Sequence, residues 1–352
     1  GRKKLLLLLQ DRAKELGVEL RFETEVGSAE DYRHEFDIVV ASDGLNSCTR
    51  SLYSDSFQPK IDHRLCQFMW LGTHQKFSDA FTFIFEETKH GWVWAHAYQF
   101  DEDTATFIVE CSQDTFDKFA FADMTQQDSI LVCERIFGEY LSGHSLMTNA
   151  NHIRGSAWIR FPRVLCETWH HENVVLLGDA SATAHFSIGS GTKLAFESAI
   201  SLAKLIHIES KLEDAFTRYQ EERRLEVLRL QSAARNSLEW FEQVERYLGL
   251  DPVQLNYSML TRSQRISHEN LRQRDPKWLE SAERWFMDQV GVPADMPVRP
   301  PMLVPLKLRK MEFKNRIVVS PMAQYLAKEG CPNDWHLSHY GERAKGGAGL
   351  VY

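Results

Sequence analysis

The feature that most constrains this chain is an acidic turn directly after a short apolar run. Residues 174–177 are Val-Val-Leu-Leu, and Gly178-Asp179-Ala180 follows them. The run predicts a buried strand, and Gly189-Ser190-Gly191-Thr192 predicts a small-residue loop that opens a helix. A carboxylate then lies at a strand's carboxyl end, beside the free backbone N–H groups of a helix N-terminus. Ribose-type hydroxyls suit the acid, and phosphate or carbonyl oxygens suit the N–H groups, so the pattern indicates a nucleotide cofactor.

A second acidic turn gives this interpretation its weight, because a single strand-Gly-Asp pattern is common in α/β proteins. The β-branched run 36–41 predicts a strand that enters Ser42-Asp43-Gly44. Arg50 follows, and it could pair with Asp43, face a phosphate or lie solvated in its loop. For Asp43 the alternative to a cofactor contact is an ordinary turn aspartate. For Asp179 the alternative to a cofactor contact is a cap of the next helix. For Gly189 and Gly191 the alternative is that they merely permit a tight turn.

Composition narrows the classes of function. The 352 residues suggest two domains, and 41 Lys and Arg against 49 Asp and Glu give a net charge of −8, which disfavours a nucleic-acid partner. The six cysteines lie far apart without a C-x-x-C pattern, so reduced thiols in a cytoplasmic protein are the better interpretation. No run approaches the ~18–20 apolar residues of a membrane span. His336 and His339 have no evident third ligand, so no metal site is expected.

The order of the expected elements places an antiparallel sheet between two stretches of α/β type. Gly1-Arg2-Lys3-Lys4 precedes a predicted amphipathic helix that runs through about Leu16 and that Gly17 ends, and residues 18–22 predict a half-buried strand. Four strand-like runs separated by turn residues predict the antiparallel sheet. These runs are residues 65–71, 81–85, 92–98 and 104–111. The elements expected after them are a helix over 116–140, a strand over 153–161 and a helix over 190–208.

A further helix is expected from Ser210, where Ser210 and Glu213 form a capping-box pattern. Its apolar positions recur at helical spacing. They are Leu212, Ala215, Phe216 and Tyr219.

Five prolines between residues 292 and 305 mark the clearest boundary in the chain. Beyond it, residues 316–320 predict a strand, residues 334–345 a helix capped by Asn333 or Asp334, and residues 348–352 another strand, which together make a β-α-β unit. The expected domains are residues 1–250 with an inserted sheet at about 60–160, a linker over 251–302, and residues 303–352.

Residues 1 to about 250 resemble the later part of the FAD-dependent aromatic hydroxylases of the p-hydroxybenzoate hydroxylase type. Three motifs carry the resemblance: Gly1-Arg2-x-x-Leu5-x-x-x-Leu9, Ala41-Ser42-Asp43-Gly44-x-x-Ser47-x-x-Arg50, and Gly178-Asp179-Ala180 with its glycine loop. It implies a Rossmann-like α/β FAD domain with an α+β substrate sheet. The residues that it implies for FAD are Arg2, Asp43, Gly44, Arg50, Gly178, Asp179, Ala180, Gly189, Ser190, Gly191 and Thr192.

Residues 303–352 resemble the start of an Old Yellow Enzyme-type reductase. The match rests on Ser320-Pro321-Met322-Ala323-Gln324-Tyr325, on residues 332–337 and on residues 346–350. It implies the first β-α-β unit of a TIM barrel, with FMN along Ser320, Pro321, Met322 and Ala323. Tyr325 would reach the active site, and its alternative is a tyrosine of the barrel core. Ala323 stands where many such enzymes have cysteine.

The order of these two parts resembles the bifunctional 2-aminobenzoyl-CoA monooxygenase/reductases and the related salicylyl-CoA 5-hydroxylases. Their Ala-His-Phe-Ser-Ile-Gly-Ser-Gly-Thr-Lys-Leu-Ala signature stands at residues 184–195, and residues 260–270 are also similar. The resemblance implies hydroxylation of an aryl-CoA at C5 with NADH or NADPH and O₂. It puts His185 and Phe186 beside the substrate ring, although a packed core histidine is the alternative. The family's G-x-G-x-x-G turn is absent, so we expect an internal fragment of a longer chain.

Some assignments stay open at this stage. Trp92, Trp94, His96 and Tyr98 share one face of a strand, which could be a pocket wall or the sheet core. Arg154, Arg160 and Arg163 could meet CoA phosphates, although surface arginines are common. The rival functions are a simple phenolic hydroxylase and a non-catalytic remnant or scaffold. A homodimer is one assembly compatible with the chain.

Overall fold

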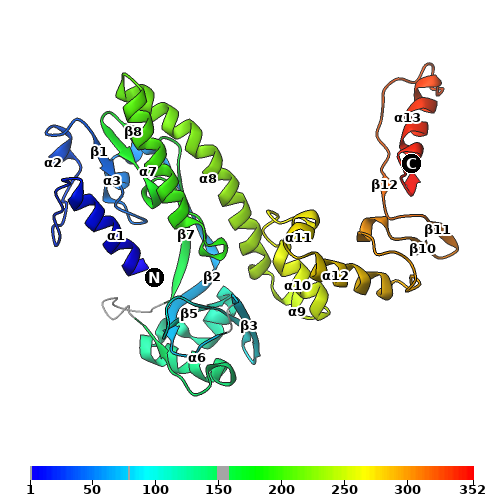
Figure 1. Ribbon diagram of the computed structural model, residues 1–352, viewed down its shortest axis with the longest axis horizontal. Helices are drawn as coiled ribbons and strands as arrows, with labels where there is room; N and C mark the ends of the chain where they lie inside the picture. Colours follow the sequence, from blue (N-terminus) through cyan, green and yellow to red (C-terminus); the bar gives the residue numbers. More distant parts are fainter. Residues whose placement is uncertain (1, 78–79, 149–157) are drawn as a thin grey trace. The chain divides into compact units, whose positions relative to one another are not determined.

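The computed structural model describes residues 2–77, 80–148 and 158–352 (Figure 1). The chain divides into two compact units, Gly1–Glu245 and Arg246–Tyr352.

A small three-stranded sheet in the first unit has the order β1-β9-β8. Its strands are β1 (Val39–Ala41), β8 (His170–His171) and β9 (Val174–Leu176). β1 and β9 run parallel, with Ala41 opposite Leu176. All three side chains of β9 are fully buried, which confirms the strand predicted from the apolar run. The strand predicted over 36–41 is present but shorter, since its ladder with β9 spans three residues.

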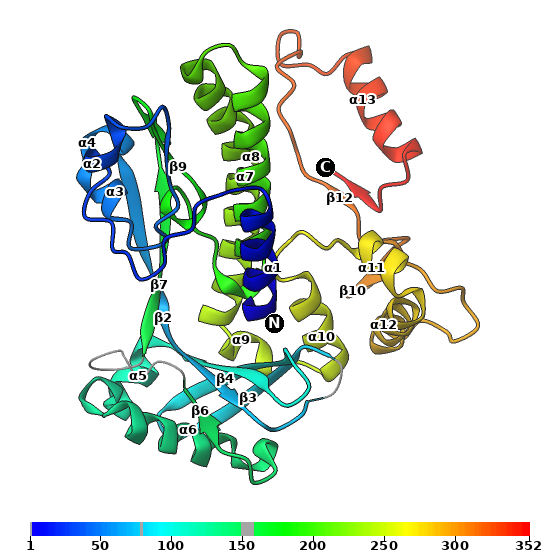
Figure 2. The ribbon, with the colours of Figure 1, turned by 60° about the vertical axis from the view of Figure 1, so that its left-hand side comes forward.

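Two helices, α7 (Gly191–Ile208) and α8 (Leu212–Glu242), lie side by side next to this sheet (Figure 2). Ala215, Phe216 and Tyr219 of α8 are fully buried, as their helical spacing predicts, whereas Leu212 is exposed at the start of the helix. The Tyr219 hydroxyl donates to the carbonyl of Leu176 at 3.2 Å. The predicted capping box is wrong, because the N-cap is Lys211 and no side chain caps this helix.

The antiparallel sheet has the order β3-β4-β5-β2-β6, and β7 also pairs with β2. The strands are β2 (Pro59–Thr73), β3 (Thr82–Thr88), β4 (Gly91–Gln99), β5 (Ala105–Cys111), β6 (Leu146–Met147) and β7 (Ile159–Cys166). The four runs predicted as strands are therefore confirmed. One face of the sheet packs against α5 (Gln113–Phe119) and α6 (Gln126–Leu141) in a single apolar core. This core includes Met69, Val93, Ala95, Phe107, Val109, Phe116 and Phe137.

A ribbon of β2 and β7 connects the two sheets of this unit. It runs from the pair Pro59 and Cys166 to the pair Phe68 and Ile159, with an irregularity between His63 and Gln67. The Cys166 N–H donates to the carbonyl of Ser181, in the turn after β9, at 3.0 Å. The predicted strand over 153–161 agrees with β7 from Ile159, and its residues 153–157 lie outside the described part of the chain.

Three predictions for the first unit need correction. Residues 18–22 form no strand, and Val18 and Phe22 are exposed, because no described strand pairs with them. Residues 116–140 are not one helix, because Ala120 adopts the left-handed conformation, a short η1 (Phe121–Asp123) follows, and Thr125 caps a new helix. α1 (Arg2–Glu15) is a helix, yet its leucines at 5–9 are all exposed, so it is not amphipathic in its packing.

The remaining short helices of this unit are α2 (Glu30–Arg33), α3 (Cys48–Leu52) and α4 (Ser54–Phe57). Across the described residues, no helix is both long and apolar enough to cross a membrane.

The second unit begins with helices where we expected a linker. They are α10 (Pro252–Thr261), α11 (His268–Arg274) and α12 (Pro276–Gln289), after the short α9 (Glu245–Leu248) at the boundary between the units. His268 joins these helices, since its ring bonds the Tyr257 hydroxyl at 3.0 Å and the Glu283 carboxylate at 2.7 Å. Arg272 pairs with the same carboxylate.

The end of the second unit is a hairpin followed by a β-α-β unit. The hairpin of β10 (Leu306–Leu308) and β11 (Met311–Phe313) was not predicted. β12 (Val318–Val319) and β13 (Leu350–Val351) pair in parallel across α13 (Asp334–Lys345), which confirms the predicted β-α-β unit. Of the two caps considered, Asn333 or Asp334, the structure has Asn333, which also forms a capping box with His336 that was not predicted.

Truncation of Phe107 tests the core beneath the antiparallel sheet. This ring is fully buried, with the Phe137 ring centroid 5.3 Å away. Phe107→Ala leaves a cavity and should lower the free energy of unfolding by about 3–5 kcal/mol in urea titrations. The matched control Phe100→Ala removes a ring that is 44% exposed and should cost far less. Equal losses for the two variants would contradict this description of the core.

Candidate functional site

The two acidic turns lie at the same edge of the small sheet. Ala41 and Leu176 are opposite each other in parallel strands, and the Leu177 N–H donates to the Ala41 carbonyl at 2.9 Å. Because the chain leaves both strands in the same direction, Asp43 and Asp179 follow at neighbouring carboxyl ends. Both side chains are exposed. The structure thus brings together the two motifs that the sequence singled out, although 136 positions separate the two acids.

Arg50 joins the two turns. Its side chain is 5% exposed, and its guanidinium donates to the carbonyl of Ala180 at 2.9 Å and to the carbonyl of Leu45. The pairing with Asp43 and the solvated position expected from the sequence are therefore both wrong. A guanidinium carries its donors in a rigid planar fork, which suits two carbonyls at once. Arg50 ties the loop after β1 to the turn after β9.

Asp43 is held by its own loop. Its carboxylate accepts from the Thr49 N–H at 3.0 Å, while Gly44 takes a positive φ of 80°. Burial acts to raise the pKa of Asp43, but hydrogen bonds from Ser47 and Thr49 outweigh it, so the pKa lies below its ordinary value. The side chain is ionised at neutral pH and exposed, so the carboxylate can accept a hydrogen bond from a ligand hydroxyl.

The Gly178-Asp179-Ala180 turn is a short η2 helix whose first position has a backbone conformation that favours glycine. Gly178 has a φ of +66°, and a Cβ there would lie 3.5 Å from the Ala195 side chain. Further on, Gly189 has a φ of +60° and leads into Ser190 and the first turn of α7. No side chain caps α7 and no acid stands in its first turn, so its N–H groups keep the partial positive charge that favours an anionic or carbonyl oxygen.

His185 and Phe186 lie between these turns and the antiparallel sheet. The His185 ring is 6% exposed, and its Nδ1 accepts from the Ser187 N–H at 3.2 Å. Burial lowers the pKa of His185 to about 4, so the ring is neutral at pH 7. Phe186 starts η3 (Phe186–Ile188), and its ring centroid is 4.7 Å from that of Phe68 and 5.8 Å from that of His96.

The aromatic stripe of β4 meets a buried acid that sequence reasoning missed. Glu110 on β5 is fully buried and accepts from Trp94 Nε1 at 2.9 Å, and its carboxylate lies 3.0 Å from His96 Nε2. Phe241 of α8 covers both rings from the other side. A glutamate inside the apolar run Phe107-Ile-Val-Glu-Cys111 was the available signal. This face of the sheet is packed with aromatic rings, and Phe186 closes one part of it.

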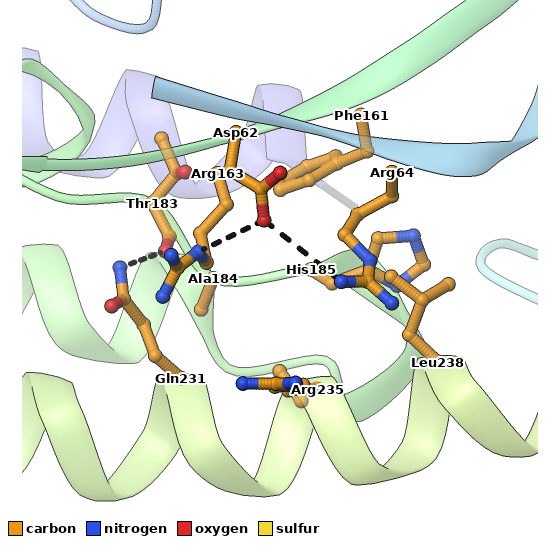
Figure 3. Close-up of a pocket in the computed structure, with 11 residues that line it drawn as sticks. Asp62, Arg64, Phe161, Arg163, Thr183, Ala184, His185, Gln231, Arg235 and Leu238 are labelled. Carbon is orange, nitrogen blue, oxygen red and sulfur yellow. Dashed lines mark hydrogen bonds and ion pairs between the residues drawn. The ribbon is translucent and has the colours of Figure 1, made fainter. Parts of the chain in front are cut away.

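A cavity of about 120 Å³ opens beside the same loop (Figure 3). Its walls come from β2, β7, the segment 183–185 and α8. The charged residues among its lining are Asp62, Arg64, Arg163 and Arg235. Of the other arginines considered from sequence, Arg160 bonds Gln113 and Arg154 lies outside the described residues. Within the described ranges, no cluster of His, Cys, Asp or Glu could hold a metal ion.

The expected FMN residues lie in the second unit, away from these turns in sequence. Ser320, Pro321, Met322 and Ala323 follow β12 and are exposed. Tyr325 is 95% exposed with a φ of +55°, so it is not a core tyrosine in this structure. Arg2 begins α1, and its side chain lies outside what the structure describes.

The chain resembles several curated enzymes in sequence. It is 37% identical over 297 residues to a salicyloyl-CoA 5-hydroxylase from a Streptomyces species, covering 81% of this chain and 56% of that protein. It is 35% identical over 243 residues to a 3-hydroxy-4-methyl-anthranilyl-[aryl-carrier protein] 5-monooxygenase from Streptosporangium sibiricum, covering 69% and 63%. The chain is thus homologous to aromatic monooxygenases, which are oxidoreductases, and spans little more than half the length of these relatives. No family model matches it.

Two further comparisons concern a short segment and the fold. A stretch of 47 residues, 13% of the chain, is 51% identical to an NADPH dehydrogenase from Listeria welshimeri and covers 14% of it. A tetrameric form of 2-methyl-3-hydroxypyridine-5-carboxylic acid oxygenase matches in structure with a TM-score of 0.50 and 15% identity, over 78% of this chain and 69% of that one. At this identity the likeness shows the fold alone: a mixed α/β arrangement that includes an antiparallel sheet.

Replacement of Arg50 tests the bridge between the two turns. Arg50→Met removes both donors and leaves the Ala180 and Leu45 carbonyls without them, which should lower the free energy of unfolding by about 1–3 kcal/mol. Arg12→Met is the control, since Arg12 lies exposed in a surface ion pair with Glu15 and such pairs contribute little. Urea unfolding of both variants measures the difference. An Arg50 variant no less stable than the Arg12 variant would rule out the bridge.

Acid titration tests the burial of His185. The folded-state pKa of about 4 lies below the ordinary 6.5, so the unfolded chain binds more protons between these values. Stability should fall as the pH drops from about 6.5 to about 4, by up to about 3 kcal/mol from this ring. His185→Gln removes the titrating group and keeps an acceptor for Ser187. The stability of the wild type relative to the variant should fall by up to about 3 kcal/mol between pH 6.5 and pH 4 and level off at lower pH, and a constant difference across this range would refute the assignment.

Proposed function

We propose that this chain is part of an FAD-dependent aromatic monooxygenase that hydroxylates an aryl-CoA at C5, with NADH or NADPH and O₂ as co-substrates. The single observation that carries the proposal is the parallel register of β1 and β9, which puts Asp43 and Asp179 at one sheet edge. The similarity to a salicyloyl-CoA 5-hydroxylase supports both the reaction and the thioester substrate. The candidate substrates are salicyloyl-CoA and 2-aminobenzoyl-CoA, and we propose a cytoplasmic location.

The residues at this edge suit FAD. Asp179 is exposed after β9 and can accept from ribityl hydroxyls, while the uncapped start of α7 offers N–H groups to the carbonyl edge of the flavin ring. Gly178, Ala180, Gly189, Ser190, Gly191 and Thr192 would let the backbone approach the cofactor. Asp43 and Gly44 would form the neighbouring wall, held to it by Arg50. When bound, FAD supplies the redox chemistry that passes electrons from the nicotinamide to oxygen.

His185 and Phe186 would border the aromatic substrate in this proposal. Phe186 packs against Phe68, Trp70 and His96, so its ring has a fixed place between the cofactor turn and the sheet. A neutral, buried His185 keeps the surroundings apolar, and because its Nδ1 accepts from the Ser187 N–H, its Nε2–H can donate one hydrogen bond. An apolar surround excludes water from the reacting ring, which an oxygen-transfer reaction requires. An amino or hydroxyl group para to the attacked carbon would make that carbon electron-rich.

For residues 303–352 we propose the start of an Old Yellow Enzyme-type domain with FMN. The match to an NADPH dehydrogenase supports this, because 47 residues is close to the length of this segment and the segment contains a parallel β-α-β unit. Ser320, Pro321, Met322 and Ala323 would lie along FMN, and the exposed Tyr325 would face its site. A simple phenolic hydroxylase predicts FAD without FMN, and a non-catalytic remnant predicts neither.

Flavin analysis of the full-length product of this gene separates these functions. Acid release and chromatography should give one FAD and one FMN per chain, with NADH or NADPH oxidation stimulated by an aryl-CoA. Asp179→Ala removes the acceptor for the ribityl hydroxyls and should weaken FAD binding about 10- to 100-fold, as loss of a charged hydrogen bond does.

Asp114→Ala is the matched control, because Asp114 is an exposed acid on α5 that pairs with Lys118. It should retain FAD with unchanged affinity. Full FAD occupancy in the Asp179 variant would contradict the assigned site. A full-length product without any flavin would contradict the proposed function as a whole.

A further inference from the structure

The cavity beside His185 contains more hydrogen-bond donors than its own residues use. The Arg163 Nε is buried and makes no hydrogen bond within the described part of the chain. Arg64 gives Nε and Nη2 to Glu242, at 3.2 and 2.6 Å, which leaves Nη1. Arg235 gives Nε to Glu239 at 2.7 Å, which leaves both terminal nitrogens. Three guanidinium groups therefore line this cavity with N–H groups to spare.

Asp62 only partly satisfies these donors. Its Oδ2 lies 3.6 Å from Arg163 Nε and 3.9 Å from Arg64 Nη1, beyond the ~2.7–2.9 Å of a charge-assisted hydrogen bond. Figure 3 shows this carboxylate between Arg64 and Arg163, with Arg235 on α8 across the cavity. One carboxylate oxygen thus stands between two cations without bonding either. A ligand with several acceptor oxygens could bond both.

The charges and the volume of the cavity limit the kind of ligand that it can bind. Glu239 and Glu242 outside the cavity and Asp62 inside it balance the three arginines, so the site offers directed donors rather than a large excess of charge. The volume of about 120 Å³ corresponds to the space of roughly four waters in the liquid. This is too small for a whole nucleotide and sufficient for one tetrahedral oxyanion at the end or bend of a longer ligand.

We propose that this cavity binds a single phosphate group, with Arg163 as the central donor and Arg64 and Arg235 at its sides. Arginine is the residue best suited to phosphate, because its planar fork can bond two oxygens at once. The phosphate belongs to the CoA part of the substrate, and this choice of source rests on the proposed function. The phosphate site itself does not rest on it, since a nicotinamide coenzyme or free phosphate would be bound by the same donors.

Calorimetric binding to the full-length gene product tests the site directly, without turnover. The probes are CoA, pantetheine, NADH, NADPH and inorganic phosphate, at low ionic strength. Arg163→Gln should weaken CoA binding about tenfold, which corresponds to about 1.4 kcal/mol, and leave pantetheine binding unchanged. Asp62→Asn removes the competing carboxylate and should strengthen CoA binding. The control Arg229→Gln changes an exposed arginine of α8 that pairs with Glu226, and should have no effect.

Opposite effects of the Arg163 and Asp62 variants on CoA support the proposal, because a merely structural role for the pair would not give opposite signs. The same opposite effects on NADH and NADPH, or on phosphate alone, support the phosphate site and overturn CoA as its source. Variants that bind every phosphate probe as the Arg229 control does overturn the site. An enzyme that binds CoA in this way but hydroxylates no aryl-CoA would refute the proposed function and leave the site standing.

Discussion

The parallel pairing of β1 with β9 is the constraint on which the candidate site depends. Three residue pairs bring two acidic turns from distant parts of the chain to one edge. So short a ladder does little to fix the loops that leave it, and Arg50 supplies the missing restraint through its bonds to Ala180 and Leu45. Buried charge-assisted hydrogen bonds of this kind hold backbone segments at a defined separation. Without Arg50, the distance between the two turns would vary, and a cofactor that contacts both would not find them at a fixed separation.

Local patterns explain which parts of the fold could be predicted from the sequence. The Gly178-Asp179 turn, the Asn333 cap and the four alternating strands each follow from neighbours within a few residues, where sterics and hydrogen bonding decide the outcome. The partners of Arg50 could not be predicted, because Ala180 lies 130 positions away. The Ser210 capping box failed because α8 begins one residue after Lys211, which leaves Ser210 outside the cap position.

Burial explains the other differences. Residues 18–22 alternate as a strand should, but alternation needs a neighbouring strand and an apolar layer, and the described residues provide neither. Conversely, Glu110 interrupts an apolar strand and would look unfavourable from sequence alone. Its cost is offset by Trp94, which lies directly opposite it on the neighbouring strand, and by His96, which lies two positions further along the same face of that strand. This pairing could not be predicted from the sequence, because it depends on the register of β4 against β5, in which Trp94 lies opposite Glu110.

The loop from Ala184 to Ser190 contributes to three surfaces at once. Its first residues line the arginine cavity and its last residues open α7, while Phe186 inserts among the rings of the antiparallel sheet. A shift of this loop would therefore change the start of α7, the aromatic face of the antiparallel sheet and the arginine-lined cavity together. The loop resists such a shift because the His185 ring contacts Phe161 of β7, the Phe186 ring contacts Phe68 of β2, and the Ser187 N–H donates to His185. These contacts set the relative positions of the three surfaces.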